Sequence, residues 1–281
     1  MSERETEFEV RRLLLAVDTA GATVSTFAAA ANLASRFGAE LVGLFLEDTR
    51  LLRAATLSTS RYVSPLVRGG DLDLSSIEAE LRALAARTRS ALAVAASAAG
   101  VAWSFSVHRG EPSEEVGKIA GPGDIVVVGP GDHIVGPRPT TGHALVQAAA
   151  HASGSIVLGR ARLHVARPLV LAQMESMLIE RALAAAVRLV DPAHPELDVL
   201  TVGASDQGIA RLRGLIDDLL GPRRINIRVR NVELANVAHL ALQAAALGND
   251  LVIVESDMPL LSGEGTEQLL EQSDCQILVV R

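Results

Sequence analysis

The amino-acid sequence predicts an α/β fold made of two tandem, doubly wound domains, each built on a five-stranded parallel sheet. Short apolar runs alternate with longer segments of helical periodicity, which is the pattern of parallel strands joined by right-handed crossovers. This order of strands and helices occurs twice along the 281 residues. In both copies the third strand alternates apolar with polar residues and the fourth is entirely apolar, so both halves share one plan.

The first domain is expected over residues 1–160. Its strands are predicted at 13–17, 41–46, 101–107, 125–128 and 156–158, and its helices at 22–37, 76–99, 114–120 and 142–151. Gly38 ends the first helix, because glycine readily adopts the left-handed conformation that closes a helix. Residues 47–70 show no clean period and contain several Ser, Pro and Gly residues, so we expect a long insertion or lid loop there.

The second domain is expected over residues 166–281 and is shorter, mainly because it has no such insertion. Its strands are predicted at 169–172, 197–202, 225–230, 251–254 and 277–280, and its helices at 176–190, 209–220, 233–247 and in a short segment before the last strand. The alternating third strand of each copy has one polar face, which is typical of a sheet edge. The linker between the domains is short, at about 159–167.

The amino-acid composition disfavours several classes of function. Aromatic residues make up 2% of the chain and the formal net charge is -7, which disfavours stacking on bases and attraction to nucleic-acid phosphates. A single cysteine allows no intramolecular disulfide and fits a reducing compartment. The charged N-terminal segment has no apolar signal core, and no apolar run reaches the roughly 20 residues of a membrane helix. We therefore expect a cytoplasmic protein with no membrane or nucleic-acid partner.

Four segments of the first half carry a resemblance to the universal stress protein family. They are RLLLAVD at 12–18, FAAAANLASRFGAELV at 27–42, HRGEPSEEV at 108–116 and DIVVVGPGD at 124–132. Nearly the whole chain follows the family's order of elements. The resemblance implies a strand order of 3-2-1-4-5 in each half. It also implies that the halves pack as an internal pseudo-dimer, since single domains of the family pair through their last strand.

The resemblance also points to a nucleotide loop. Nucleotide-binding members carry G-x-x-G-x9-G-[S/T], in which glycines let backbone amides approach phosphate oxygens and a helix N-terminus favours negative charge. Aligned on Gly129, this chain has Asp132 at the second glycine and, after nine intervening residues, Gly142 and His143. An aspartate near a triphosphate is electrostatically unfavourable without a metal ion. The motif is therefore degenerate.

The remaining positions of the family's nucleotide site are only partly retained in this chain. Asp18 ends the first strand, where an acid in the family contacts the adenosine, and Gly131 can replace the second glycine only by breaking the spacing. In the second half the first strand ends at Gln173 instead of an acid. The loop ESDMPLLSGEGTEQ there keeps only Gly265 and Thr266 of the motif. We expect a degenerate nucleotide site in the first half and a further diverged one in the second.

The sequence shows no nucleophile elbow, Walker loop or dinucleotide fingerprint. His143 and His151 are eight residues apart, which is too far for neighbouring ligands on one helix, so no metal site is expected. The predicted function is a non-enzymatic stress-response or regulatory module that holds a small anionic ligand or a protein partner. The first alternative is binding of ATP or another adenine nucleotide, with at most slow hydrolysis, in the first half. The second alternative is an interaction scaffold that binds no ligand. The sequence does not decide whether two chains form a homodimer.

Overall fold

The computed structural model describes residues 8–17, 23–49, 74–128, 155–158, 167–233, 236–259, 265, 268 and 275–281. In the first half the strands are β1 (Arg12–Val17), β2 (Glu40–Asp48), β3 (Trp103–Gly110), β4 (Asp124–Val128) and β5 (Ser155–Leu158). The helices of that half are α1 (Val24–Phe37), α3 (Leu74–Ala99) and α4 (Pro112–Ile119). The predicted helix at 142–151 and residues 50–70 of the predicted insertion lie outside the described residues.

In the second half the strands are β6 (Pro168–Ala172), β7 (Glu196–Val202), β8 (Asn226–Val232), β9 (Leu251–Glu255) and β10 (Gln276–Val280). Its helices are α6 (Ile179–Leu189), α7 (Asp206–Leu220) and α8 (Val237–Leu247). Helix α8 starts four residues later than the sequence predicts. The reason is its cap, because the side chain of Asn236 accepts a hydrogen bond from the backbone N–H of His239 at 3.0 Å.

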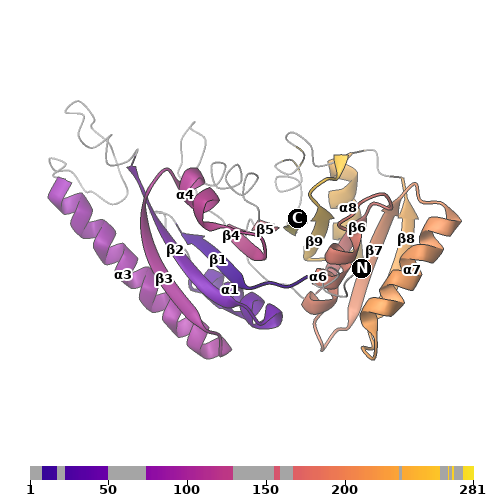
Figure 1. The fold of residues 1–281 in the computed structure, drawn as a ribbon, viewed down its shortest axis with the longest axis horizontal. Helices are drawn as coiled ribbons and strands as arrows, with labels where there is room; N and C mark the ends of the chain where they lie inside the picture. Colours follow the sequence, from indigo (N-terminus) through magenta and orange to yellow (C-terminus); the bar gives the residue numbers. More distant parts are fainter. Residues whose placement is uncertain are drawn as a thin grey trace.

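The ten strands form one sheet in the order β3-β2-β1-β4-β5-β10-β9-β6-β7-β8 (Figure 1). Counted from either outer edge, each half has the order 3-2-1-4-5, which confirms the predicted fold class. Pairs within a half are parallel, whereas β5 and β10 pair antiparallel with Leu278 opposite Val157. The two five-stranded sheets are thus joined through their last strands, as the predicted pseudo-dimer requires.

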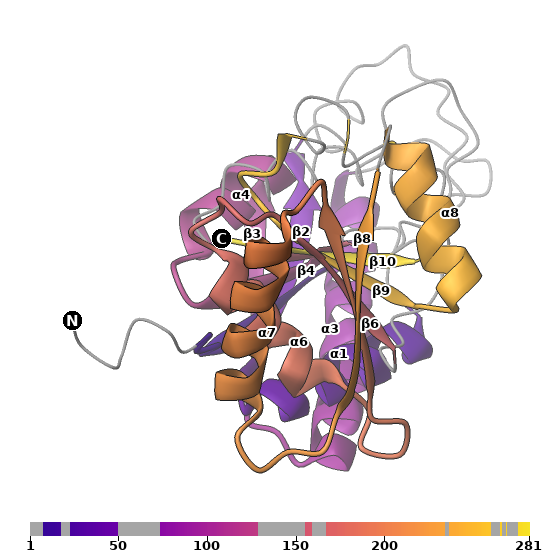
Figure 2. The same ribbon diagram turned by 90° about the vertical axis from the view of Figure 1, so that its right-hand side faces the viewer.

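Helices cover both faces of this sheet, and each face has its own apolar core. Successive side chains of a strand point to opposite faces. On β1, Leu13 and Leu15 belong to the cluster under α1, α3, α6 and α7, while Leu14 belongs to the cluster under α4 and α8. Both clusters contain residues of both halves, so the core is continuous across the junction. Figure 2 shows α7 and α8 on opposite sides of the sheet.

Direct contacts between helices also join the two halves. Helices α1 and α6 pack against each other, and the Arg36 guanidinium at the end of α1 donates a hydrogen bond to the carbonyl oxygen of Leu189 at the end of α6. A cation near the carboxyl end of a helix is favourable, because the helix dipole is negative there. The junction therefore combines strand pairing, shared core and helix-end contacts.

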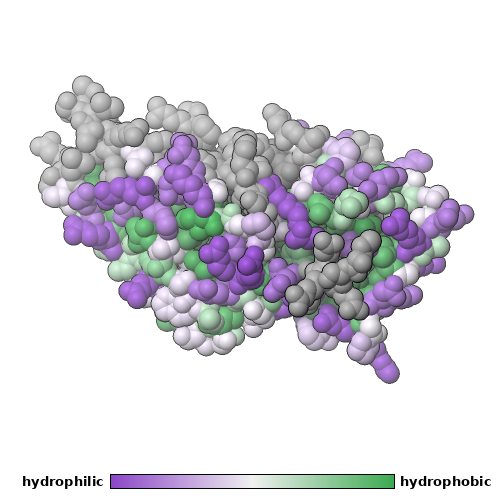
Figure 3. Space-filling model, in the orientation of Figure 1, coloured by the Kyte–Doolittle hydropathy of each residue, from purple (hydrophilic) through white to green (hydrophobic). Residues whose placement is uncertain are grey.

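The surface is mainly polar. On the face drawn in Figure 3, hydrophilic residues interrupt the hydrophobic areas. Among the described residues, the exposed large apolar side chains belong to separate elements or turns and are Val24, Val94, Val107, Met177, Val202 and Leu242. Scattered apolar residues of this kind are normal on a folded protein. Among the described helices, none is both long and apolar enough to cross a membrane.

Candidate functional site at the carboxyl ends of the strands

Ligands of open parallel sheets bind in the crevice at the carboxyl ends of the strands, where the chain order reverses. Here this point lies between β1 and β4 in the first half and between β6 and β9 in the second, and both pairs are adjacent and parallel. The six residues predicted for the nucleotide site all lie outside the described residues. They are Asp18, Gly129, Gly131, Asp132, Gly142 and His143.

The described strand ends still bear on this prediction. β1 ends at Val17, directly before Asp18, and β4 ends at Val128, directly before Gly129. Ala16 is the register partner of Val128, so the two strands finish side by side at one edge of the sheet. Both predicted segments therefore leave the sheet at neighbouring points.

Beside the first crevice, Glu47 on β2 forms an ion pair that sequence reasoning missed. Its buried carboxylate accepts a hydrogen bond from Nε of Arg109 on β3 at 2.8 Å. The Arg109 guanidinium also lies 3.7 Å from the Glu78 carboxylate on α3. Because this pair holds the ends of β2 and β3 together, β2 continues to Asp48, two residues into the predicted insertion.

The second crevice is described in more detail, and it contains carboxylates. Glu255 is the last residue of β9 and is fully buried. Its Oε2 accepts a hydrogen bond from the backbone N–H of Gln173, just after β6, at 3.3 Å. Its Oε1 is buried and accepts no hydrogen bond from the part of the chain that is described. A carboxylate thus occupies the floor of the crevice.

Ser176 and Asp257 lie beside Glu255. The Ser176 hydroxyl donates to the Asp257 carboxylate at 3.0 Å and accepts from the backbone N–H of Leu178, also at 3.0 Å. The bond from the Leu178 N–H to the Ser176 hydroxyl closes a turn that precedes α6, so the helix starts at Ile179 and not at 176. No histidine takes part in these contacts, so the described geometry offers this serine no general base other than a carboxylate.

Burial raises the pKa of Glu255 from 4.5 to about 7, because the ionised form loses its hydration. The nearby Ser176 hydroxyl and the hydrogen bond from the Gln173 backbone N–H oppose this rise, and the neighbouring Asp257 charge adds to it. Near neutral pH the Glu255 carboxyl is therefore divided between its neutral and ionised forms. In the described part of the chain, no three His, Cys, Asp or Glu side chains are grouped in a way that could hold a metal ion.

Solved structures of other proteins share this architecture. A universal stress protein from Archaeoglobus fulgidus DSM 4304 superposes with a TM-score of 0.65 at 16% identity, over 99% of this chain and 98% of that one. The chain has the universal-stress-protein fold. A protein classed with the universal stress proteins, from Pseudomonas aeruginosa UCBPP-PA14, gives a TM-score of 0.54 at 14% identity, over 97% of this chain and 94% of the other.

A functionally unknown protein from Pseudomonas aeruginosa PAO1 is also similar, with a TM-score of 0.53 at 14% identity, over 97% of this chain and 93% of that one. No model of a known protein family matches the sequence, and no curated protein does. These identities establish the universal-stress-protein fold. They carry no activity with them, since one fold hosts many functions.

Within the universal-stress-protein fold, the two crevices differ at one structurally equivalent position. Val126 is the register partner of Leu14 in the first half, and Val252 is the partner of Leu169 in the second, and all four belong to the same apolar cluster. Counting three residues along the chain from Val126 and from Val252 pairs position 129 with Glu255. The first half therefore has Gly129, the first glycine of the predicted nucleotide loop, where the second has a buried acid. In the sequence this appears as DIVVVG at 124–129 against DLVIVE at 250–255.

Proposed function

We propose that this chain is a non-catalytic stress-response or regulatory module with the universal-stress-protein fold, and that its second crevice binds no nucleotide. The observation that carries the proposal is the burial of Glu255 at the end of β9. Its carboxylate holds the backbone N–H of Gln173, a donor that would otherwise face a ligand. In the second half, a side chain of the protein thus occupies the place of an anionic ligand.

Electrostatics supports this reading. Two like charges 4 Å apart repel by about 4 kcal/mol at the effective dielectric constant of a protein surface. That repulsion alone would weaken binding of a phosphate group by roughly a thousandfold. Binding with Glu255 protonated avoids the repulsion but still requires the N–H of Gln173 to exchange its partner. Asp257 adds a second carboxylate beside the same crevice.

The second candidate is adenine-nucleotide binding in the first half, with at most slow hydrolysis. It is favoured by the position of β1 and β4, whose neighbouring ends lead into Asp18 and Gly129, and by the glycine at position 129 in place of Glu255. Both candidates predict that one chain binds no more than one nucleotide. A module of this kind acts on a protein partner, or holds a small anionic ligand, in the cytoplasm.

Isothermal titration of ATP with Mg²⁺ into the full chain tests the proposal. We expect either no binding or a stoichiometry of at most one, with no steady release of phosphate. Asp18→Ala should abolish any binding at the first crevice, and Glu255→Gln should leave the stoichiometry unchanged, since Gln still occupies the same volume. Two ATP molecules bound per chain, or multiple turnovers of hydrolysis, would refute a non-catalytic module with a closed second crevice.

A further inference from the structure

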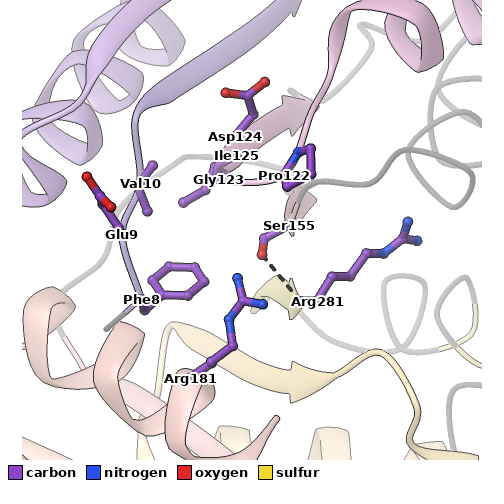
Figure 4. Close-up of a pocket in the computed structure, with 10 residues that line it drawn as sticks. All are labelled: Phe8, Glu9, Val10, Pro122, Gly123, Asp124, Ile125, Ser155, Arg181 and Arg281. Carbon is purple, nitrogen blue, oxygen red and sulfur yellow. Dashed lines mark hydrogen bonds between the residues drawn. The ribbon is translucent and has the colours of Figure 1, made fainter. Parts of the chain in front are cut away.

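A small cavity lies at the junction of the two halves, at the edge of the sheet where β4 and β5 begin and β10 ends (Figure 4). The first half contributes the segment before β1, the turn into β4 and the start of β5, and the second half contributes α6 and the residue after β10. Its volume of ≈ 60 Å³ accommodates about four water molecules, judged by the space that one buried water needs. We propose that this cavity binds a small inorganic oxyanion such as phosphate.

Arg181 on α6 supplies the principal cation. Its guanidinium lies 5.7 Å from the centre of the Phe8 ring, in a cation–π contact, and forms no hydrogen bond or ion pair with the described residues. In Figure 4 the guanidinium points into the space between Phe8 and Ser155. A guanidinium offers several N–H donors in one plane, a geometry that suits an oxyanion.

Ser155, at the start of β5, supplies a second donor. Its side chain is buried, and its oxygen accepts a hydrogen bond from the backbone N–H of Arg281 at 3.3 Å. Within the described ranges no acceptor takes the hydrogen of the Ser155 hydroxyl. A buried hydroxyl gains from a partner for that hydrogen, and an anion in the cavity would provide one.

The charge balance at the cavity favours an anion. Asp124 is already neutralised, because Arg12 donates to both of its carboxylate oxygens, at 3.0 and 2.6 Å. Glu9 is exposed, and Figure 4 shows its carboxylate directed away from Arg181. Arg281 also lines the cavity, but Figure 4 shows its guanidinium directed away from Arg181. Neither carboxylate among the lining residues thus competes with an anion for Arg181.

The size of the cavity restricts the ligand class. The space fits one tetrahedral oxyanion but not a nucleotide, whose pockets usually measure several hundred Å³. Because residues of both halves line the cavity, the site exists only when the two halves are joined. Its lining includes neither Val17 and Val128, at the first crevice, nor Gln173 and Glu255, at the second, so the site is separate from the residues of the proposed nucleotide chemistry.

Thermal unfolding of the full chain with increasing sodium phosphate, against sodium chloride at the same ionic strength, tests this proposal. A ligand that binds only the folded state raises the unfolding temperature in proportion to its occupancy. We expect phosphate to stabilise the wild type more than chloride does. Arg181→Gln should weaken the apparent affinity by about tenfold or more, since a charge-assisted hydrogen bond contributes about 1.5–3 kcal/mol. Ser155→Ala should weaken it in the same direction.

Two control variants separate this site from general charge effects and from the first crevice. Arg213→Gln removes an exposed arginine on α7 and should retain the phosphate response, as should Asp18→Ala. If Arg181→Gln does not fold, Arg181→Lys keeps the charge but loses the planar donor pair, and should still weaken phosphate by about threefold or more. No phosphate-specific stabilisation of the wild type, or an equal response in the Arg181 and Arg213 variants, would overturn the proposal.

Discussion

Replacing Glu255 by Gln tests the energetic role of the buried acid directly. Gln has nearly the same shape, can keep the acceptor for the Gln173 backbone N–H, and carries no charge at any pH. Since the carboxyl is fully buried and its pKa is raised, the wild type must either ionise it at a cost or keep it protonated. The Gln side chain cannot ionise, so the variant never buries a charge at this position.

The sign of the effect follows from the pKa. In the folded chain the pKa of Glu255 is about 7, above its ordinary value of 4.5. The folded state therefore holds the proton over a range in which the unfolded state has released it. The stability due to this proton is fully present below pH 4.5 and is lost as the pH rises through 7. At about 1.4 kcal/mol for each pH unit, the loss amounts to about 3 kcal/mol.

The assay is urea unfolding of wild type and Glu255→Gln from pH 5 to pH 8.5. Near pH 5 the two proteins should have similar free energies of unfolding. At pH 8.5 the variant should be more stable, by up to about 3 kcal/mol. Glu175→Gln, an exposed carboxylate in the turn that follows β6, removes the same charge and serves as the control. Its difference from wild type should stay within about 0.5 kcal/mol at every pH.

Parallel stability curves for wild type and Glu255→Gln over this pH range would refute the reasoning. They would mean that the Glu255 carboxyl has the same proton affinity in the folded and unfolded chains. The second crevice would then be open to water, and the main support for the proposed function would be lost.

Two further substitutions test contacts that position the sheet. Asp198 is buried on β7, receives two hydrogen bonds from Arg228 at 2.8 Å and one from the side chain of Asn249 at 3.1 Å, so Asp198→Ala should cost about 3–5 kcal/mol in urea unfolding. Gly43 on β2 lies where an added Cβ would be 2.7 Å from Cδ2 of the buried Leu92, so Gly43→Ala should cost about 1–3 kcal/mol by overpacking.

Each of these has a matched control in α7. Asp218 is exposed, so Asp218→Ala should change the free energy of unfolding by no more than about 0.5 kcal/mol. At Gly214 an added Cβ meets no atom within 4 Å, so Gly214→Ala should stabilise the chain by about 0.5–1 kcal/mol. An Asp198→Ala variant as stable as Asp218→Ala, or a Gly43→Ala variant that gains stability, would contradict the structure's account of these sites.

The sequence was sufficient for the elements of the sheet because local patterns decide them. Pure apolar runs marked the central strands, such as β4 and β9, and strict alternation marked β3 and β8, which the structure places at the two outer edges. The sequence predicted the first and last turns of helices less accurately. The start of α8 depends on the cap at Asn236, and the start of α6 on a bond between Ser176 and Asp257, which lie far apart in the sequence.

The candidate site was less predictable. Sequence motifs directed attention to Asp18 and the loop after Gly129, whereas the described structure draws attention to Glu255. A glutamate after an apolar run usually ends a strand in solvent. Its burial results from the adjacent β6 and the turn that brings the Gln173 N–H to its carboxylate. No pattern local to residue 255 contains that information.

By itself, the sequence determined the α/β class, the two copies and the strands, since the spacing of apolar residues fixes which faces must be buried. Only the tertiary structure decided which distant groups meet. It joined β5 to β10, placed a carboxylate at the floor of one crevice, and brought Arg181 of one half toward Phe8 and Ser155 of the other. The physical reason is that ion pairs, burial and cavities depend on contacts between residues far apart in the chain, which local periodicity does not encode.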